Sequence, residues 1–207
     1  SALALDEAEK TLERWHGKDL RDEVVPLLKP VIENTTCLGL LGGHHDMTYS
    51  DGTNSTQRLC QELGVDYLGD GETMIRVKLV SNNGETLSFV IYATHGQGNG
   101  QAVGSNITKL ERMSAFFDAD ILLRGHSCDK FIFQVPQYYL AKSIPPRLRQ
   151  RNRIIANTGS FSDGRSEHET TYVERKNLYP KALGYVQIHI HVVREKVTDT
   201  RYLQIGD

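Results

Sequence analysis

The 207-residue chain lacks the features that mark several large classes of protein. It has three cysteines, Cys37, Cys60 and Cys128, and an odd number without a short pair spacing argues against a disulfide framework or a zinc ribbon. No apolar run approaches the roughly 20 residues of a membrane-spanning helix. Residues 1–10 have neither the basic nor the apolar region of a signal peptide. We therefore expect a protein of the reducing cytoplasm with no membrane partner.

The chain also has no excess of charge of one sign. Its 24 Lys and Arg residues stand against 26 Asp and Glu residues, so nothing in the net charge of −2 favours nucleic acid or anionic membranes. The hydrophobic content of 39% is adequate for a sizeable core, and no linker, repeat or low-complexity tract interrupts it. We expect one domain over 1–207, with a helical part over 1–34, an α/β part over 36–128 and a β-rich part over 130–207.

Hydrophobic periodicity predicts the order of helices and strands. The first 34 residues have helical spacing, with a break or kink at Pro26 and Pro30. Two further helices are predicted, over 55–63 with Gly64 as its end and over 106–117 with Asn106 as its N-terminal cap. Strands are predicted over 36–42, 65–68, 73–80, 86–93, 119–123, 153–156, 172–173, 183–193 and 202–205. Residues 130–140 are predicted to form either one long strand or a strand pair.

Three short apolar runs end in the same way. The run 38–41 leads into Gly42-Gly43-His44-His45-Asp46, the run 89–94 into His95-Gly96, and the run 121–124 into Gly125-His126. Ligands of open α/β sheets bind beyond the carboxyl ends of the strands, so these histidines are expected to meet there. Neutral imidazoles suit zinc, manganese and iron. One such histidine would be read as structural, but three in this pattern favour a metal site.

Two other segments leave alternatives open. The glycine-rich stretch 96–104 is neither a P-loop nor a dinucleotide-binding fingerprint, and it is either a phosphate cradle or a mobile loop beside the site. Four arginines alternate along an extended segment and would share one side, as a phosphate-facing strip or as a solvated face. They are Arg147, Arg149, Arg151 and Arg153.

The three histidine segments, in this order, resemble the motifs of the calcineurin-like metallophosphoesterase family. Gly43-His44-His45-Asp46 resembles the family's Gly-Asn-His-Asp/Glu motif, His95-Gly96 its next histidine motif, and Gly125-His126-Ser127-Cys128 its Gly-His-x-His motif. The resemblance runs from about Thr36 to the C-terminus, and residues 96–126 are similar to members from phages and bacteria. It implies a four-layer αββα sandwich that hydrolyses phosphomonoesters or phosphodiesters with two divalent metal ions, Mn, Fe or Zn.

The resemblance also implies a role for each matching residue. His45 matches the histidine that donates a proton to the leaving oxygen, and Asp46 matches the carboxylate that orients it. This pairing is chemically sensible, because a carboxylate that holds an imidazole fixes its tautomer and favours its protonated form. The residues that match metal ligands are His44, His95 and His126 on one ion and Cys128 on the other.

The chain departs from the family's pattern at three points. His44 stands where the family has Asn, which exchanges an oxygen ligand for a nitrogen ligand. Cys128 stands where the family has its last His, and its thiolate would bind zinc or iron but is oxidisable, with Asp129 as a fallback ligand. The early motifs Asp-x-His and Gly-Asp-x-x-Asp have no counterpart before Thr36. We expect that the sequence lacks the first β-α segment of a longer protein, a degenerate relative being the alternative.

Two functions follow from these observations. The first is a metal-dependent phosphoesterase in which metal-activated water attacks phosphorus and His45 acts as the general acid. The second is a non-catalytic binding or scaffold module of the same fold, favoured by the missing carboxylates and by Cys128. Metal content separates them, since the enzyme would hold two ions and the module one or none. The alternating arginines keep nucleic acid open as a substrate beside smaller phosphoesters.

Overall fold

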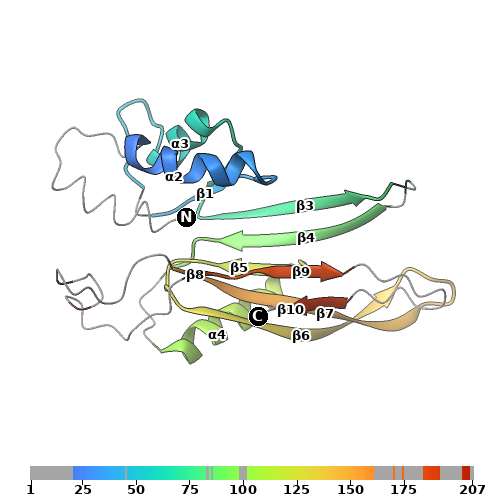
Figure 1. Cartoon of the computed structure of the whole chain (residues 1–207). Coiled ribbons are helices and arrows are strands. Elements are labelled where there is room, and N and C mark those ends of the chain that lie inside the picture. The colour runs from blue at the N-terminus through green and yellow to red at the C-terminus, as the bar shows by residue number, and fades with distance from the viewer. Residues whose placement is uncertain are drawn as a thin grey trace.

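The computed structural model describes residues 21–44, 46–82, 84, 86–97, 102–160, 170, 174, 184–191 and 202–205. These residues form a mixed α/β structure in which a six-stranded sheet is flanked by helices (Figure 1). None of the helices described is long and apolar enough to cross a membrane. The helix predicted over residues 1–20 lies outside the described part of the chain.

Helix α2 (Arg21–Glu33) runs without interruption through both of its prolines. Of the break or kink predicted at Pro26 and Pro30, the break is therefore wrong, and a kink stays a prediction. A proline removes one backbone hydrogen bond and strains its own turn, but α2 also packs against helix α3, and its Val24 is buried. Tertiary packing thus outweighs the local cost of the prolines.

Strands β1 (Leu40–Gly42) and β2 (Tyr67–Asp70) form a small parallel sheet of their own. The strand predicted over 36–42 is therefore shorter than expected, and it is not enclosed on both faces, since Leu38 is 43% exposed. The physical reason is that β1 has a single strand neighbour among the described residues. The strand ends at Gly42, and the chain leaves it through Gly43 toward His44.

Helix α3 (Ser55–Leu63) connects these two strands and has the predicted bounds. The side-chain oxygen of Asn54 caps its N-terminus by accepting the Gln57 N–H at 2.7 Å. Gly64 ends the helix with φ of 67°, in the left-handed region that favours glycine. The sequence signals at both ends are local, which explains why the prediction is confirmed.

The central sheet places three parallel strands in its middle and an antiparallel strand on either side. The carboxyl ends of the three parallel strands therefore lie at one end of the sheet, together with the starts of the outer two. Across the sheet the strands are β3 (Glu72–Val80), β4 (Thr86–Thr94), β5 (Ile121–Arg124), β7 (Arg147–Ser160) and β6 (Lys130–Ala141), with β8 (Gly184–Tyr185) paired to the end of β7.

Strands β6 and β7 form one long hairpin that extends beyond the rest of the sheet (Figure 1). Of the two alternatives predicted for 130–140, the single long strand is confirmed and the strand pair is wrong. The strand predicted over 153–156 is longer than expected, because its first part pairs with β6 as far as Ala141 opposite Arg147. Strand pairing thus extends a segment that has too few apolar residues to be recognised alone.

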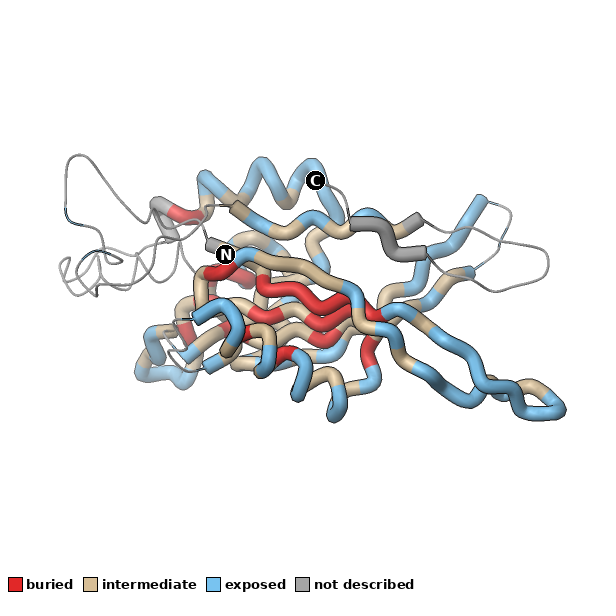
Figure 2. Tube along the Cα trace, turned by 90° about the horizontal axis from the view of Figure 1, so that it is seen from below, coloured by how far each residue is buried: buried red, intermediate tan, exposed pale blue. Residues whose placement is uncertain are grey.

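Helix α4 (Val103–Phe116) packs against β5 and β7. The helix predicted over 106–117 is confirmed, but Asn106 is not its cap, because the helix begins three residues earlier and Asn106 is fully buried. Figure 2 shows that the buried residues gather in the middle strands of the sheet. The core cluster on the α4 face consists of Tyr92, Leu110, Ala119, Leu122 and Ile155.

Strands β9 (Ile188–His191) and β10 (Tyr202–Ile205) form an antiparallel ribbon in front of the sheet in Figure 1, where β10 contacts β7. Among the described residues, the strands outside the six-stranded sheet form only two-stranded sheets. The α/β class is therefore confirmed, whereas the second large sheet of an αββα sandwich is not seen in this part of the chain.

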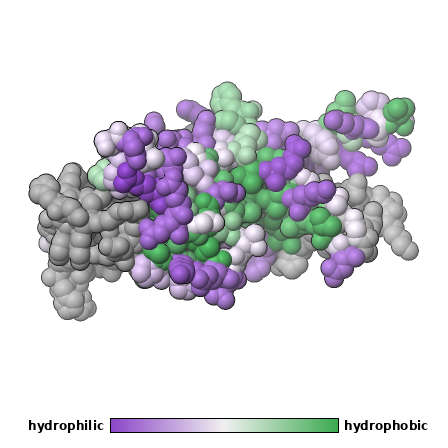
Figure 3. All heavy atoms as spheres, turned by 90° about the horizontal axis from the view of Figure 1, so that it is seen from above, coloured by the Kyte–Doolittle hydropathy of each residue, from purple (hydrophilic) through white to green (hydrophobic). Residues whose placement is uncertain are grey.

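Figure 3 views the molecule from the side of α2, α3 and β3, where apolar patches alternate with hydrophilic surface. Helix α2 accounts for part of this pattern, because Val24 is buried while Leu27 and Val31 are exposed. Strand β3 adds Met74, Leu79 and Val80, all exposed. Both elements therefore leave apolar residues exposed on this side of the molecule.

Candidate functional site

The three predicted histidines reach the same end of the central sheet by different routes. Strand β4 leads into His95 and strand β5 leads into the turn that carries His126. His44 comes from the small sheet, which is joined to the large one through the backbone. The Gly71 N–H donates to the Gly42 carbonyl at 3.0 Å, and the His95 N–H donates to the Gly71 carbonyl at 2.7 Å. This chain of hydrogen bonds brings the end of β1 to the end of β4.

The imidazole rings of His44, His95 and His126 lie against one another, and we call them the histidine cluster. Ring centroids are 5.0 Å apart for His44 and His95, 4.6 Å for His44 and His126, and 5.1 Å for His95 and His126. One ligand nitrogen from each ring lies within 4.8 Å of the other two. Three nitrogen donors at this spacing fit a divalent transition metal ion. The prediction that these histidines come together is confirmed.

Two of the glycines beside the histidines are required by close contacts. A Cβ on Gly43 would lie 2.5 Å from His95 Nδ1, so the backbone packs directly on that ring. Gly96 has φ of +81°, and its Cβ would lie 2.8 Å from Arg124 Nε. Glycine at these positions therefore has a steric reason, which supports the motif on physical grounds.

The turn between β5 and β6 holds two non-glycine residues in the left-handed region. His126 has φ of 67° and Cys128 has φ of 58°, a conformation that is uncommon for residues other than glycine and is found at functional sites. The Ser127 N–H donates to the Gly125 carbonyl at 2.8 Å and tightens the turn. Cys128 is not in the histidine cluster, and its Sγ lies 3.5 Å from the His126 carbonyl oxygen. Its role as a ligand of a second ion stays a prediction.

Asp46 anchors the turn that follows β1. Its Oδ2 accepts the Gly43 N–H at 3.1 Å, and its Oδ1 accepts the hydroxyls of Ser55 at 3.2 Å and Thr56 at 3.0 Å. The carboxylate thus ties the histidine segment to the start of α3. His45 lies outside the described residues, so its role as proton donor, and that of Asp46 in orienting it, stay predictions.

A buried polar network supports the β5–β6 turn, and the sequence analysis missed it. Arg124 Nη1 donates to Asn106 Oδ1 at 2.9 Å and to Ser127 Oγ at 3.3 Å. Asn106 Nδ2 donates to Asp129 Oδ2 at 2.6 Å, while Asn157 Nδ2 donates to the Asp129 carbonyl. Burial lowers the pKa of the Arg124 guanidinium, and the charge of Asp129 opposes this shift.

The position of one member of this network, Asn157, could have been recognised from the sequence. Asn157 follows the apolar run of β7 just as His95 follows that of β4, and parallel pairing of β7 with β5 carries it to the same end of the sheet. Asn106 had no such signal, since a polar residue near a helix start is usually a cap. Only the packing of α4 shows that it faces Asp129.

A second missed group surrounds Asp70, at the end of β2. Its Oδ1 accepts hydrogen bonds from Asn54 Nδ2, at 2.6 Å, and from the Tyr67 hydroxyl. Burial, together with the bond to Asp70, raises the pKa of Tyr67 to about 12. Asn54 therefore serves both as the cap of α3 and as a donor to this carboxylate.

A cavity of about 840 Å³ adjoins the histidine cluster. It is lined by His44 and His95, by residues of the β2–β3 connection, and by side chains of α4. Gly96 and Gln97, the start of the glycine-rich stretch, line it too, while residues 98–101 of that stretch lie outside the described residues. The cavity gives the cluster a space in which a small molecule can be bound.

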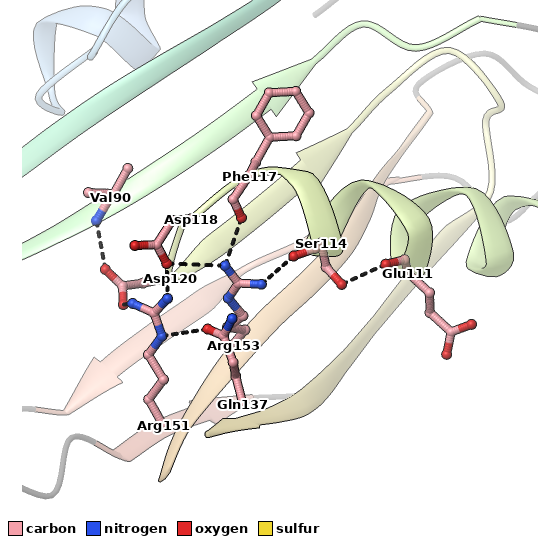
Figure 4. Close-up of polar contacts among 9 residues, drawn as sticks. All are labelled: Val90, Glu111, Ser114, Phe117, Asp118, Asp120, Gln137, Arg151 and Arg153. Atoms are coloured by element: carbon pink, nitrogen blue, oxygen red, sulfur yellow. Dashed lines mark hydrogen bonds and ion pairs between the residues drawn. The ribbon is translucent and has the colours of Figure 1, made fainter. Parts of the chain in front are cut away.

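The four alternating arginines do not behave alike: Arg147 and Arg149 are exposed, as the solvated face predicts, whereas Arg151 and Arg153 are engaged by other protein groups. Arg151 pairs with Asp118 through Nη2 and lies 3.4 Å from Asp120 through Nη1 (Figure 4). Asp120 also accepts the Val90 N–H at 2.9 Å, which ties this ion pair to β4. Both alternatives considered for the strip are therefore wrong for Arg151, which is a structural residue at the far end of the sheet strands.

Arg153 is the second of these arginines whose side chain is engaged by other protein groups. It is 3% exposed, and its guanidinium donates to the carbonyls of Ser114 and Phe117, the latter at 2.7 Å, at the end of α4 (Figure 4). A cation is favourable at a helix C-terminus. Burial lowers the pKa of Arg153, and the neighbouring Arg151 adds to the shift. A nucleic-acid substrate stays a prediction, and Arg151 and Arg153 no longer support it.

Comparison with known proteins adds little to this geometry. No protein-family model matches the chain, and no curated protein sequence matches it significantly. Four chains of solved structures match. One is a conserved uncharacterized protein from Streptococcus pneumoniae described as a predicted phosphoesterase, with 16% identity, a TM-score of 0.31 and 68% of each chain covered. A likeness at this level carries no argument, so the function is argued from the site itself.

Proposed function

We propose that this protein hydrolyses phosphoesters and that the histidine cluster holds a divalent metal ion for the reaction. The observation that carries the proposal is the convergence of His44, His95 and His126 from three separate elements, with ligand nitrogens within 4.8 Å of one another. A ring that served packing alone would not need two neighbours of the same kind at this spacing. The adjoining cavity supplies room for a substrate.

A divalent ion bound here would act as a Lewis acid toward a phosphoryl oxygen and would activate water for attack on phosphorus. The chain's own residues hold and shape the site. Gly43 allows the backbone to lie against His95, and Asp46 fixes the turn on which His44 stands. His45, the next residue, donates a proton to the leaving oxygen in this proposal, which is the role that its motif implies.

We also propose the finer assignment, a calcineurin-like metallophosphoesterase with a four-layer αββα arrangement and Mn, Fe or Zn as its metal. The order of the three motifs and their places at strand ends support it. Cys128 would contribute to a second ion. Asp70 and Asp129 are among the carboxylates that the fold brings to this end of the sheet.

The test combines metal binding with hydrolysis on the same variants. Purified protein is stripped with EDTA and titrated with Mn²⁺ and Zn²⁺ by calorimetry, and hydrolysis of p-nitrophenyl phosphate and bis(p-nitrophenyl) phosphate is then measured. We expect His95→Ala and His126→Ala to lower metal affinity and activity by about 100-fold or more, since loss of even an outer-shell partner costs 10- to 100-fold. Affinity should also fall between pH 7.5 and 5.5, because imidazole must be neutral to ligate.

The matched control is His189→Ala, which removes an exposed histidine of β9 that is not in the histidine cluster. It should change neither metal affinity nor rate. Metal binding without hydrolysis of either ester would favour the binding or scaffold module. Absence of metal binding in the wild-type protein would overturn the metal site and the enzyme together.

A further inference from the structure

The cavity beside the histidine cluster carries charges of both signs. Its carboxylates are Asp46, Asp70 and Glu72, and its cations are Lys109, Arg112 and Arg124. A bound ligand interacts most strongly with the charged groups that are not already engaged by other protein groups. The partners of each charged side chain therefore decide which kind of ligand the cavity favours.

All three carboxylates are engaged by hydrogen-bond donors of the protein. Asp46 accepts from the α3 hydroxyls, as described above. Asp70 accepts from Asn54 and Tyr67. Glu72 Oε2 accepts the Tyr92 hydroxyl at 2.6 Å, and burial together with this bond raises the pKa of Tyr92.

The three cations of the cavity differ in whether protein groups engage them. Arg124 is 2% exposed and is held by Asn106, Ser127 and the Gln97 carbonyl, the last at 3.0 Å. The side chains of Lys109 and Arg112 take part in no ion pair or hydrogen bond with any residue that the structure describes. They are thus the two charges in the cavity that the described protein groups leave available.

Their spacing on α4 brings the two cations together. Residues three apart on a helix lie on the same face, and both line the cavity that His44 and His95 also line. Lysine and arginine bind phosphate oxygens through charge-assisted hydrogen bonds, and arginine does so in a bidentate manner. The cavity therefore presents the histidine cluster and two cations that have no partner in the described part of the chain to the same ligand.

We propose that Lys109 and Arg112 bind the non-esterified oxygens of a terminal phosphate group, so that the preferred substrate is a phosphomonoester. This inference rests on the proposed function and names the substrate class of that site. A phosphomonoester carries up to two negative charges and three non-esterified oxygens, whereas a phosphodiester carries one charge and two such oxygens. Two cations in addition to a metal ion match the monoester.

The experiment compares a double variant with a charge-matched control. Lys109→Gln with Arg112→Gln removes two charges from the cavity and keeps good helix formers on α4. Arg76→Gln with Lys78→Gln removes two charges from exposed positions of β3 that do not line the cavity. Both proteins and the wild type are titrated with inorganic phosphate by calorimetry, first after EDTA treatment and then with Mn²⁺. Steady-state kinetics follow, with p-nitrophenyl phosphate and bis(p-nitrophenyl) phosphate.

We expect the cavity variant to bind inorganic phosphate at least about 10-fold more weakly, with and without metal, because two charge-assisted contacts are lost. Its KM for the monoester should rise by a similar factor while kcat changes less than about threefold. Its KM and kcat for the diester should stay within about twofold of wild type. All constants of the β3 control should also stay within about twofold of wild type.

The outcomes separate this inference from the proposed function. If the wild type hydrolyses neither ester but the metal-free protein binds phosphate and the cavity variant does not, the anion site stands and the enzyme proposal fails. If hydrolysis is present but phosphate binding and monoester KM are unchanged in the cavity variant, the inference is overturned while the enzyme stands. An equal rise in KM for both esters would overturn the assignment to monoesters.

Discussion

Gly43 is the residue on which the histidine cluster depends most directly. Its backbone lies against the His95 ring, where a Cβ would come within 2.5 Å of Nδ1 and 2.7 Å of Cγ. Such distances are far inside van der Waals contact, so one methyl group must displace either the ring or the turn. The position of a metal ligand is thus controlled by the absence of a side chain next to it.

Gly43→Ala should therefore reduce metal affinity by about 10-fold or more while the protein stays folded, because the displaced His95 no longer meets the other two ligands. Calorimetric titration with Mn²⁺ and circular dichroism measure the two quantities. Gly104→Ala is the matched control, since a Cβ there meets nothing within 4 Å. Gly104 lies in α4, and the change should raise the free energy of unfolding by about 0.5–1 kcal/mol. Equal metal affinity in both variants would contradict the steric argument.

Tyr67 gives a prediction about pH. Its pKa is raised to about 12 in the folded protein by burial and by the bond to Asp70, against about 10 in an unfolded chain. Its contribution to stability is therefore fully present below pH 10 and is lost as the pH rises toward 12, because the unfolded state ionises first. Urea unfolding between pH 9 and 11.5 should show a steeper loss for wild type than for Tyr67→Phe. Parallel curves would show that this hydroxyl is not held as described.

The cysteines give a test of the predicted second ligand. Cys60 is 2% exposed and burial raises its pKa, so it should react with iodoacetamide only after unfolding. Cys37 and Cys128 are partly exposed and should react in the folded state. If Cys128 ligates a metal ion, Mn²⁺ or Zn²⁺ will slow its alkylation and leave that of Cys37 unchanged, as mass spectrometry of the modified peptides can measure. Equal rates with and without metal would remove Cys128 from the ligand set.

At the scale of the elements, α4 contributes a polar residue to the interior rather than a cap. Asn106 joins Arg124 of β5 to Asp129, which precedes β6, so one side chain connects a helix with two strand ends. Both of its partners are buried and charged. A network of this kind rigidifies the turn that carries His126 only while every member is satisfied.

Asn106→Leu should lower the free energy of unfolding by about 3–5 kcal/mol, since it leaves a buried guanidinium and a buried carboxylate without their shared amide. Thr108→Leu, an exposed change on the same helix, should stay within about 0.5 kcal/mol of wild type. Chemical unfolding followed by circular dichroism measures both. A loss below about 1 kcal/mol for Asn106→Leu would mean that the network does not support the turn.

At the scale of the whole molecule, the site joins two sheets that share no strand pairing among the described residues. Backbone hydrogen bonds through Gly71 connect the end of β1 with the end of β4, and this junction helps to bring His44 to the cluster. A metal ion held by His44, His95 and His126 would therefore cross-link the small sheet to the large one.

Metal should accordingly stabilise the folded protein as a whole. At 100 times its dissociation constant, a ligand of the native state alone adds about 2.7 kcal/mol, which for a chain of this length corresponds to about 5–10 °C in Tm. Differential scanning calorimetry of EDTA-treated protein with added Mn²⁺ should show this rise for wild type and the His189→Ala control. His95→Ala should show almost none, and a full rise in that variant would place the metal elsewhere.

The sequence by itself determined the elements with strong local signals and the identity of the three histidines. Helix α3, with its asparagine cap and terminal glycine, and the apolar runs that end in His95 and His126 depend on interactions within a few residues. Such interactions can be recognised without the fold, because propensity, capping and periodicity act along the chain. The glycines beside the histidines belong to the same local motifs.

Only the tertiary structure decided how polar side chains are used across elements. Arg151 and Arg153 are spaced like a solvated face, yet acidic residues and the end of α4 engage them. Asn106 resembles a cap and is buried, and Asp70 became part of the site only when β2 paired with β1. The spacing of a polar residue in the sequence is the same whether its side chain is hydrogen-bonded to water or to a carboxylate far along the chain. Long-range packing supplies the free energy that decides between these two partners.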